Sequence, residues 1–113
     1  MVKFYNSNDI KFEDHPKFTG VKIAKLVGKK DGSPIGVSIL NIEPSIEIPI
    51  HTHEESIDSI YCLEGQGLIY NGTSWVDLNQ GDYCFVPQKE EHGVKNIGQS
   101  ALKLFIVHSP ALF

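Results

Sequence analysis

Three of the five histidines, His51, His53 and His92, lie at positions where they could take part in chemistry. His51 and His53 are separated by one residue, so in an extended strand their side chains point to the same face, about 7 Å apart along the backbone. Two imidazoles on one face can bind one metal ion, and Asp58 follows after a short turn with a carboxylate that could supply an oxygen ligand. The block from His51 to Asp58 therefore predicts a metal site.

Short apolar runs separated by glycine and proline indicate which elements carry these side chains. The turn residues recur roughly every 8–12 residues, which is typical of an all-β sandwich or barrel, and no window has a helical periodicity. The predicted strands are Val21–Val27, Ile35–Ile42, Glu47–Ile50, Ser59–Leu63, Gly67–Tyr70, Trp75–Leu78, Tyr83–Val86, Gly93–Asn96 and Leu102–His108. Because antiparallel strands must protect their edges, we expect barrel closure or a two-sheet jelly roll.

Two blocks of the sequence resemble the paired motifs of the cupin superfamily, G-x5-H-x-H-x(3,4)-E-x6-G and G-x5-P-x-G-x2-H-x3-N. The matching positions are His51, His53 and Gly65 in the first block and Gly81, Pro87, His92 and Asn96 in the second. The departures are Ser45 and Lys89, which stand in place of glycines, and Asp58, which stands in place of the glutamate ligand. The resemblance covers residues 45–96 by motif, and the flanking strands fit the same small barrel.

The resemblance implies an all-β fold, a double-stranded β-helix (jelly-roll) barrel of about 8–10 short antiparallel strands. It also implies one divalent transition metal bound by His51, His53, Asp58 and His92. Three imidazoles and one carboxylate leave up to two positions open around an octahedral ion, and they suit Mn, Fe, Ni, Co or Zn. Since aspartate is one methylene shorter than glutamate, Asp58 must approach from a shifted backbone, bind through water, or orient the histidines.

The expected function is that of a metal-binding small cupin acting as an enzyme on a small, metal-chelating organic substrate. Among the reactions of the family, a dioxygenase is favoured slightly over an isomerase or lyase. One alternative is a non-catalytic barrel that binds or senses a small ligand, and another is a barrel in which the metal is structural. The chain contains no arginine, so no guanidinium can clamp a phosphate or dicarboxylate. A compact neutral or monoanionic substrate is therefore expected.

Strand parity predicts the lining of the pocket. If Asp58 faces inward, Ile60 and Cys62 do so as well, and an outward Lys103 places Leu104, Ile106 and His108 inside. These residues, Ile60, Cys62, Leu104, Ile106 and His108, are the predicted substrate pocket. His108 is the candidate catalytic residue, as a general base, and its alternative role is a hydrogen bond at the end of its strand. Cys62 is expected to pack as a small apolar side chain, although a thiol ligand is the alternative.

Length and charge limit the remaining choices. A chain of 113 residues suits one domain, which we place at residues 21–113 after an N-terminal arm at 1–20 with a short strand near Val2–Tyr5. The net charge of −4 argues against nucleic acid, and the chain has no apolar stretch that could span a membrane or act as a signal. Two cysteines within apolar runs favour a reduced, cytoplasmic protein. The resemblance implies a homodimer, and the candidate contact is the arm with its aromatic residues Phe4, Tyr5, Phe12 and Phe18. His15, also in the arm, is expected to be a surface loop residue.

Overall fold

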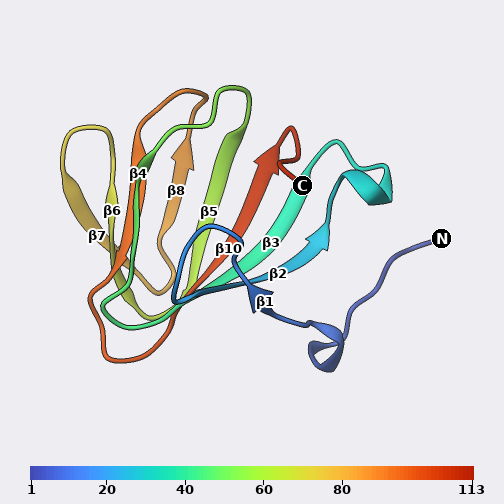
Figure 1. Ribbon diagram of the computed structural model, residues 1–113, viewed down its shortest axis with the longest axis horizontal. Helices are drawn as coiled ribbons and strands as arrows, with labels where there is room; N and C mark the ends of the chain where they lie inside the picture. The colour runs from blue at the N-terminus through green and yellow to red at the C-terminus, as the bar shows by residue number, and fades with distance from the viewer.

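The computed structural model describes residues 1–113 as two antiparallel sheets that pack face to face (Figure 1). The six-stranded sheet has the order β1 (Glu13–Asp14), β2 (Val21–Val27), β3 (Gly36–Ile42), β10 (Leu102–Ser109), β5 (Ile57–Glu64) and β8 (Tyr83–Val86). The four-stranded sheet has the order β4 (Glu47–His51), β9 (His92–Asn96), β6 (Gln66–Tyr70) and β7 (Trp75–Asn79). Two 3-10 turns, η1 (Ser7–Asp9) and η2 (Lys29–Asp31), complete the regular structure, and neither is long enough to cross a membrane.

The predicted all-β jelly-roll fold is confirmed, and all nine predicted strands occur with ends shifted by at most two residues. Alternation of apolar and polar residues in these strands matches the observed burial. In β3, for example, every second residue from Gly36 to Ile42 is buried. Turn residues separate the elements: Gly32 ends η2 in the left-handed conformation, and the Asn71 side chain accepts hydrogen bonds from the backbone N–H groups of Thr73 and Ser74.

Of the two arrangements expected, the structure has the two-sheet jelly roll, and its sheets do not close into a continuous barrel. Strands β1 and β8 remain the edges of one sheet, and β4 and β7 remain the edges of the other. Side chains, and not a backbone ladder, fill the space between the sheets. The core cluster has 14 buried residues contributed by both sheets, among them Ile42, Ile60, Leu78 and Leu102. This core is apolar, and it contains none of the histidines.

The N-terminal arm differs from its prediction in one detail. No strand forms near Val2–Tyr5; the arm instead pairs through the two-residue β1, in which Glu13 lies opposite Ile23 and Asp14 opposite Lys22. Earlier in the arm the Tyr5 hydroxyl donates a hydrogen bond to the Leu26 carbonyl. The arm therefore contacts β2 at Tyr5 and at Glu13–Asp14.

Candidate metal centre

His51 and His92 stand opposite each other at the end of the β4–β9 ladder. The register of that ladder shifts between Ile48 and His51, where Pro49 lacks a backbone donor and lies on an edge strand. A side chain on Gly93 would meet the Ile48 carbonyl oxygen at 3.0 Å, so glycine permits the close approach of the two strands. The local sequence thus brings two imidazoles together, with ring centroids 4.3 Å apart.

Hydrogen bonds to the backbone fix the protonation pattern of these two rings. Nδ1 of His51 lies 2.7 Å from the Pro49 carbonyl oxygen, and Nδ1 of His92 lies 3.0 Å from the Glu90 carbonyl oxygen. A carbonyl oxygen only accepts, so each Nδ1 carries the proton and donates it. The lone pair of each neutral ring is then on Nε2, the arrangement that metal-binding histidines usually have.

His53 completes a group of three. One ligand nitrogen from each of His51, His53 and His92 lies within 4.8 Å of the others. The His53 ring is 5.0 Å from that of His51 and 5.1 Å from that of His92, between centroids. His92 is buried, and its Nε2 faces Asp58 Oδ2 at 2.8 Å without forming a hydrogen bond of good geometry. Three convergent nitrogens, with one buried and unsatisfied, are the donor set that a divalent transition metal would satisfy.

Asp58 is the charged group at the base of this cluster. Its side chain is buried, its Oδ2 lies 2.8 Å from His92 Nε2 and 3.6 Å from His53 Nε2, and its Oδ1 contacts His108 Nε2. Burial raises the pKa of the Asp58 carboxyl, but the contacts with His108, His53 and His92 outweigh burial and hold this pKa well below its usual range. Asp58 is therefore an anion surrounded by imidazoles, adjacent to the three-histidine group.

The neighbouring histidines respond to burial and to this anion in different ways. Burial lowers the pKa of His51. Burial acts in the same direction on His92, but the contact with Asp58 and the Glu90 carbonyl give a net rise of its pKa. His51 is thus ready to bind a cation at lower pH than His92.

His108 lies at the same end of the molecule, at the end of β10 and opposite Asp58 in the β10–β5 register. Together with His53 and Asp58 it forms a second cluster whose ligand atoms lie within 4.8 Å of one another. The two clusters share His53, but the five side chains do not form a single group whose ligand atoms all lie within 4.8 Å of one another. The His108 Nδ1 is buried and has no hydrogen-bond partner.

The other predicted pocket residues lie deeper. Ile60, Cys62, Leu104 and Ile106 all face inward as parity predicts, and they pack within the apolar core cluster.

Two cavities near the histidines have other linings. One of about 410 Å³ includes His53 and extends over the residues Lys29, Thr52, Glu54, Glu55, Ser56, Pro110, Ala111 and Leu112. Both cysteines are free, and burial raises the pKa of each thiol.

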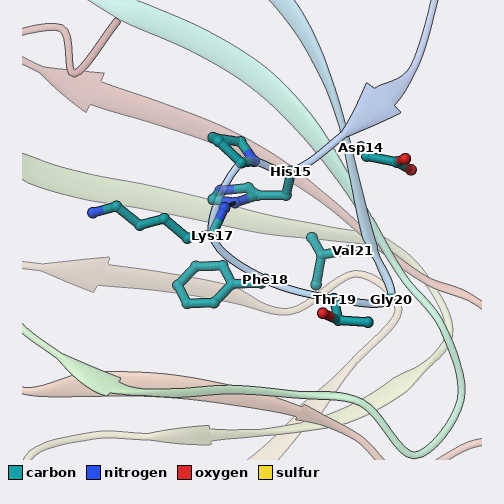
Figure 2. A pocket seen from close by; sticks show the side chains of 8 residues that line it. Asp14, His15, Lys17, Phe18, Thr19, Gly20 and Val21 are labelled. Carbon is teal, nitrogen blue, oxygen red and sulfur yellow. Dashed lines mark hydrogen bonds between the residues drawn. The ribbon is translucent and has the colours of Figure 1, made fainter.

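The second cavity contains residues that sequence reasoning missed. It has about 300 Å³ and lies against the segment Asp14–Val21 (Figure 2). His15, expected at the surface, stacks on Phe18 at 4.7 Å between centroids, and Phe18 lies 6.2 Å from the His51 ring and packs against the core. The sequence feature that could have indicated this position is the aromatic Phe18 just before Thr19-Gly20. Gly20 has φ +78° and lies against Ile46, so the chain turns at this point.

Comparison with known proteins agrees with this geometry. The model of the cupin domain family matches residues 38–108. The oxalate-binding protein of Thermotoga maritima is 28% identical over 68 residues, which are 60% of this chain and 56% of that protein. Quercetin 2,3-dioxygenase of Bacillus subtilis is 33% identical over 63 residues, 56% of this chain but only 18% of the enzyme.

Solved structures share the fold at low sequence identity. The crystal structure of a predicted oxalate decarboxylase from Thermotoga maritima superposes with a TM-score of 0.86 at 24% identity, covering 96% of this chain and 99% of that one. The chain spans little more than half of the oxalate-binding protein that it matches in sequence. The family match covers more than half of this chain, including both histidine-bearing motifs. The chain therefore belongs to the cupin domain family.

Proposed function

We propose that the protein binds one divalent transition metal through His51, His53 and His92, with Asp58 as the adjoining carboxylate, and acts as an enzyme on a small chelating substrate. The observation that carries this proposal is the convergence of three imidazole nitrogens within 4.8 Å of one another. In two of these rings, His51 and His92, Nδ1 donates to a backbone carbonyl, which leaves Nε2 free to bind the ion. Mn, Fe, Ni, Co and Zn all suit such a donor set.

A bound ion would polarise a chelated hydroxyl or carbonyl group of the substrate and so ease loss of a proton from it. The residues of the chain supply the rest. Asp58 contributes a negative charge that partly offsets that of the ion, and it contacts Nε2 of His108. An ionised carboxylate oxygen favours an N–H facing it, which leaves the lone pair of His108 on Nδ1. We therefore propose His108 as the general base.

The reaction class that we favour is dioxygenation, with isomerisation or lyase chemistry as the runner-up. Support comes from the sequence likeness to the quercetin 2,3-dioxygenase of Bacillus subtilis, an enzyme named for an oxygen-dependent reaction. The cavity of about 410 Å³ that His53 helps to line supports this proposal as a route for a small ligand. With no arginine in the chain, a neutral or singly charged substrate suits this site better than a phosphate ester.

The alternative is a barrel that binds or senses a small ligand without turning it over. The likeness to the oxalate-binding protein of Thermotoga maritima favours this alternative, because that protein is named for binding. Oxygen uptake separates the two functions. The protein is reconstituted with each of the five metals and given catechols, enols and thiols in an oxygen electrode, with His92→Gln as the matched control. Metal-dependent uptake that the variant lacks supports the enzyme, whereas tight ligand binding without uptake or product supports the binding protein.

We also propose that the protein is a cytoplasmic homodimer. Its two free thiols suit a reducing compartment. Exposed aromatic residues on the outer face of the six-stranded sheet, Tyr61, Tyr83 and Phe85, support self-association, as does the exposed Phe4 of the arm. Phe18 is half-buried and packs partly against the core, so it is less accessible to a second chain than Phe4. Sedimentation equilibrium tests this proposal: twice the chain mass supports it, and the mass of a single chain contradicts it.

A further inference from the structure

The cavity against Asp14–Val21 contains none of the three histidines, but Phe18 in its lining lies 6.2 Å from the His51 ring, between centroids. The segment runs along the edge strand β4, since Gly20 lies against Ile46 at the beginning of that strand and Phe18 lies near His51 at its end. The backbone N–H of His15 donates to the Val21 carbonyl oxygen at 2.9 Å, which closes the segment into a loop. The loop thus forms a wall beside the cluster on the side of His51.

The loop presents an apolar ring, that of Phe18, and two polar donors, Lys17 and His15. Figure 2 shows the side chains of His15, Lys17 and Phe18 extending from the same side of the loop. The Lys17 backbone N–H donates to His15 Nδ1 at 3.1 Å. Nδ1 is therefore the acceptor, and the neutral His15 ring carries its proton on Nε2, where it can donate to a ligand.

The charges around the cavity favour a single negative charge on the ligand. Asp14 and Lys17 are the ionised side chains of the lining. Lys25 also acts here, because the pKa of His15 is lowered first by burial and then by the positive charges of Lys17 and Lys25. Lys25 lies 3.5 Å from Glu13, so part of its charge is already neutralised. One ammonium suits one carboxylate, and the Asp14 carboxylate disfavours a ligand with more negative charge.

We infer that this cavity receives the part of the ligand that extends beyond the metal, and that the ligand is a small flat monocarboxylate whose other end chelates the ion. Phe18 and the His15 ring stacked on it form the apolar side of the cavity against which the flat part packs, and Lys17 and His15 donate to the carboxylate. This inference rests on the proposed function, since it requires a metal bound at the three histidines. It adds the chemical class of the ligand and assigns its recognition to the N-terminal segment.

Two probes that differ only in charge test the inference. The protein is reconstituted with Co²⁺ and titrated calorimetrically under argon with 3,4-dihydroxybenzoate and with 3,4-dihydroxybenzamide. Both can chelate through their adjacent hydroxyl groups, and only the first carries a carboxylate. Because Lys17 is exposed, we expect the benzoate to bind about three to five times more tightly than the benzamide. Lys17→Met should abolish this preference.

A matched control and a second variant complete the test. Lys11→Met removes the same charge from another exposed lysine of the arm and should preserve the preference for the benzoate. Phe18→Leu should weaken both probes, and a thermal melt checks that this variant is folded. If Lys17→Met keeps the preference, or if Lys11→Met also abolishes it, the subsite is wrong while metal-dependent binding of the probes still supports the proposed function. If neither probe binds in a Co²⁺-dependent manner, the proposed chelating function fails and the subsite fails with it.

Discussion

His51 and His92 are register partners across the β4–β9 ladder, and their imidazole centroids lie 4.3 Å apart. Each ring also donates its Nδ1 proton to a backbone carbonyl two residues earlier in the chain. The backbone therefore sets both the position and the tautomer of two nitrogens of the proposed site. His53 follows β4 and adds the third nitrogen, so two strands and the chain just after one of them position the whole triad.

Metal content should depend on His92 and much less on His108. Replacing His92 by Gln removes one of three convergent nitrogens, so we expect affinity for Co²⁺ or Mn²⁺ to fall by about 100-fold or more. His108→Gln leaves the triad intact and should retain one ion per chain. Elemental analysis after dialysis measures the metal content of both variants. Loss of metal from His108→Gln but not from His92→Gln would place the ion in the other cluster, that of His53, Asp58 and His108.

The Asp58 carboxylate should strengthen metal binding whether it touches the ion or only orients the imidazoles. In Asp58→Asn the amide keeps the size of the side chain and removes its charge, so we expect Co²⁺ affinity to decrease about 10- to 100-fold. Glu55→Gln removes a charge from the exposed turn nearby and should have little effect. Competition with a chromophoric chelator measures the affinities. Equal affinities for wild type and Asp58→Asn would show that the carboxylate has no part in the site.

Metal uptake should depend on pH through His92. The contact with Asp58 gives this residue a net rise of pKa above 6.5 in the metal-free protein, so a proton competes with the ion up to a higher pH than at an ordinary histidine. Affinity should therefore fall as pH decreases through the His92 pKa, by about tenfold per pH unit for each proton displaced.

Asp58→Asn provides the control for that pH dependence. Without the anion the His92 pKa is lower, so the decrease in affinity should begin at lower pH than in the wild type. Titrations with Co²⁺ at a series of pH values, followed by visible absorption, give both curves. An unchanged onset in the variant would mean that Asp58 does not control the protonation of His92.

Gly93 should be required for the alignment of His51 with His92. A Cβ at this position would lie 3.0 Å from the Ile48 carbonyl oxygen and 3.1 Å from the Ile50 amide nitrogen, so Gly93→Ala must push the strands apart. We expect a loss of about 1–3 kcal/mol in the free energy of unfolding and weaker metal binding. Gly98→Ala is the control, because its nearest neighbours lie at an ordinary 3.5 Å. Denaturant unfolding measures both variants, and equal stability would contradict this reading of the β4–β9 contact.

Metal removal should lower stability without unfolding the protein. The apolar core of 14 residues contains none of the histidines, so the fold persists when a chelator is added. An ion at 100 times its dissociation constant adds about 2.7 kcal/mol to the free energy of unfolding. Thermal melts with and without EDTA should therefore each show one cooperative transition, and the transition should occur at a lower temperature in EDTA. A chain that loses its cooperative transition in EDTA would instead have a structural metal.

Most of the fold could be predicted from the sequence because its strands are short, alternating and bounded by turn residues. In β3 and β10 the alternation of buried and exposed side chains follows the pleat directly. The two-residue β1 could not be predicted, because Glu13 and Asp14 are both exposed and carry no pattern. Barrel closure could not be settled either, since strand patterns determine which face is buried and leave the edge-to-edge pairing open.

The candidate site was predictable to a similar degree. The H-x-H spacing places His51 and His53 on one face, and the second motif supplies His92. The position of His15 and Phe18 was not predictable, since an irregular arm has no periodicity to orient it. Its path depends on the left-handed Gly20 and on contact with Ile46, which is 26 residues further along the chain.

The most direct test of the metal centre is the location of the ion itself. Crystals of the protein reconstituted with Co²⁺ are measured on both sides of the cobalt absorption edge, and the anomalous difference map locates the metal. We expect one peak per chain, bonded to Nε2 of His51, His53 and His92 at about 2.0–2.2 Å. A peak bonded to His53, Asp58 and His108 without His51 and His92, or no peak at this end of the sandwich, would contradict the account.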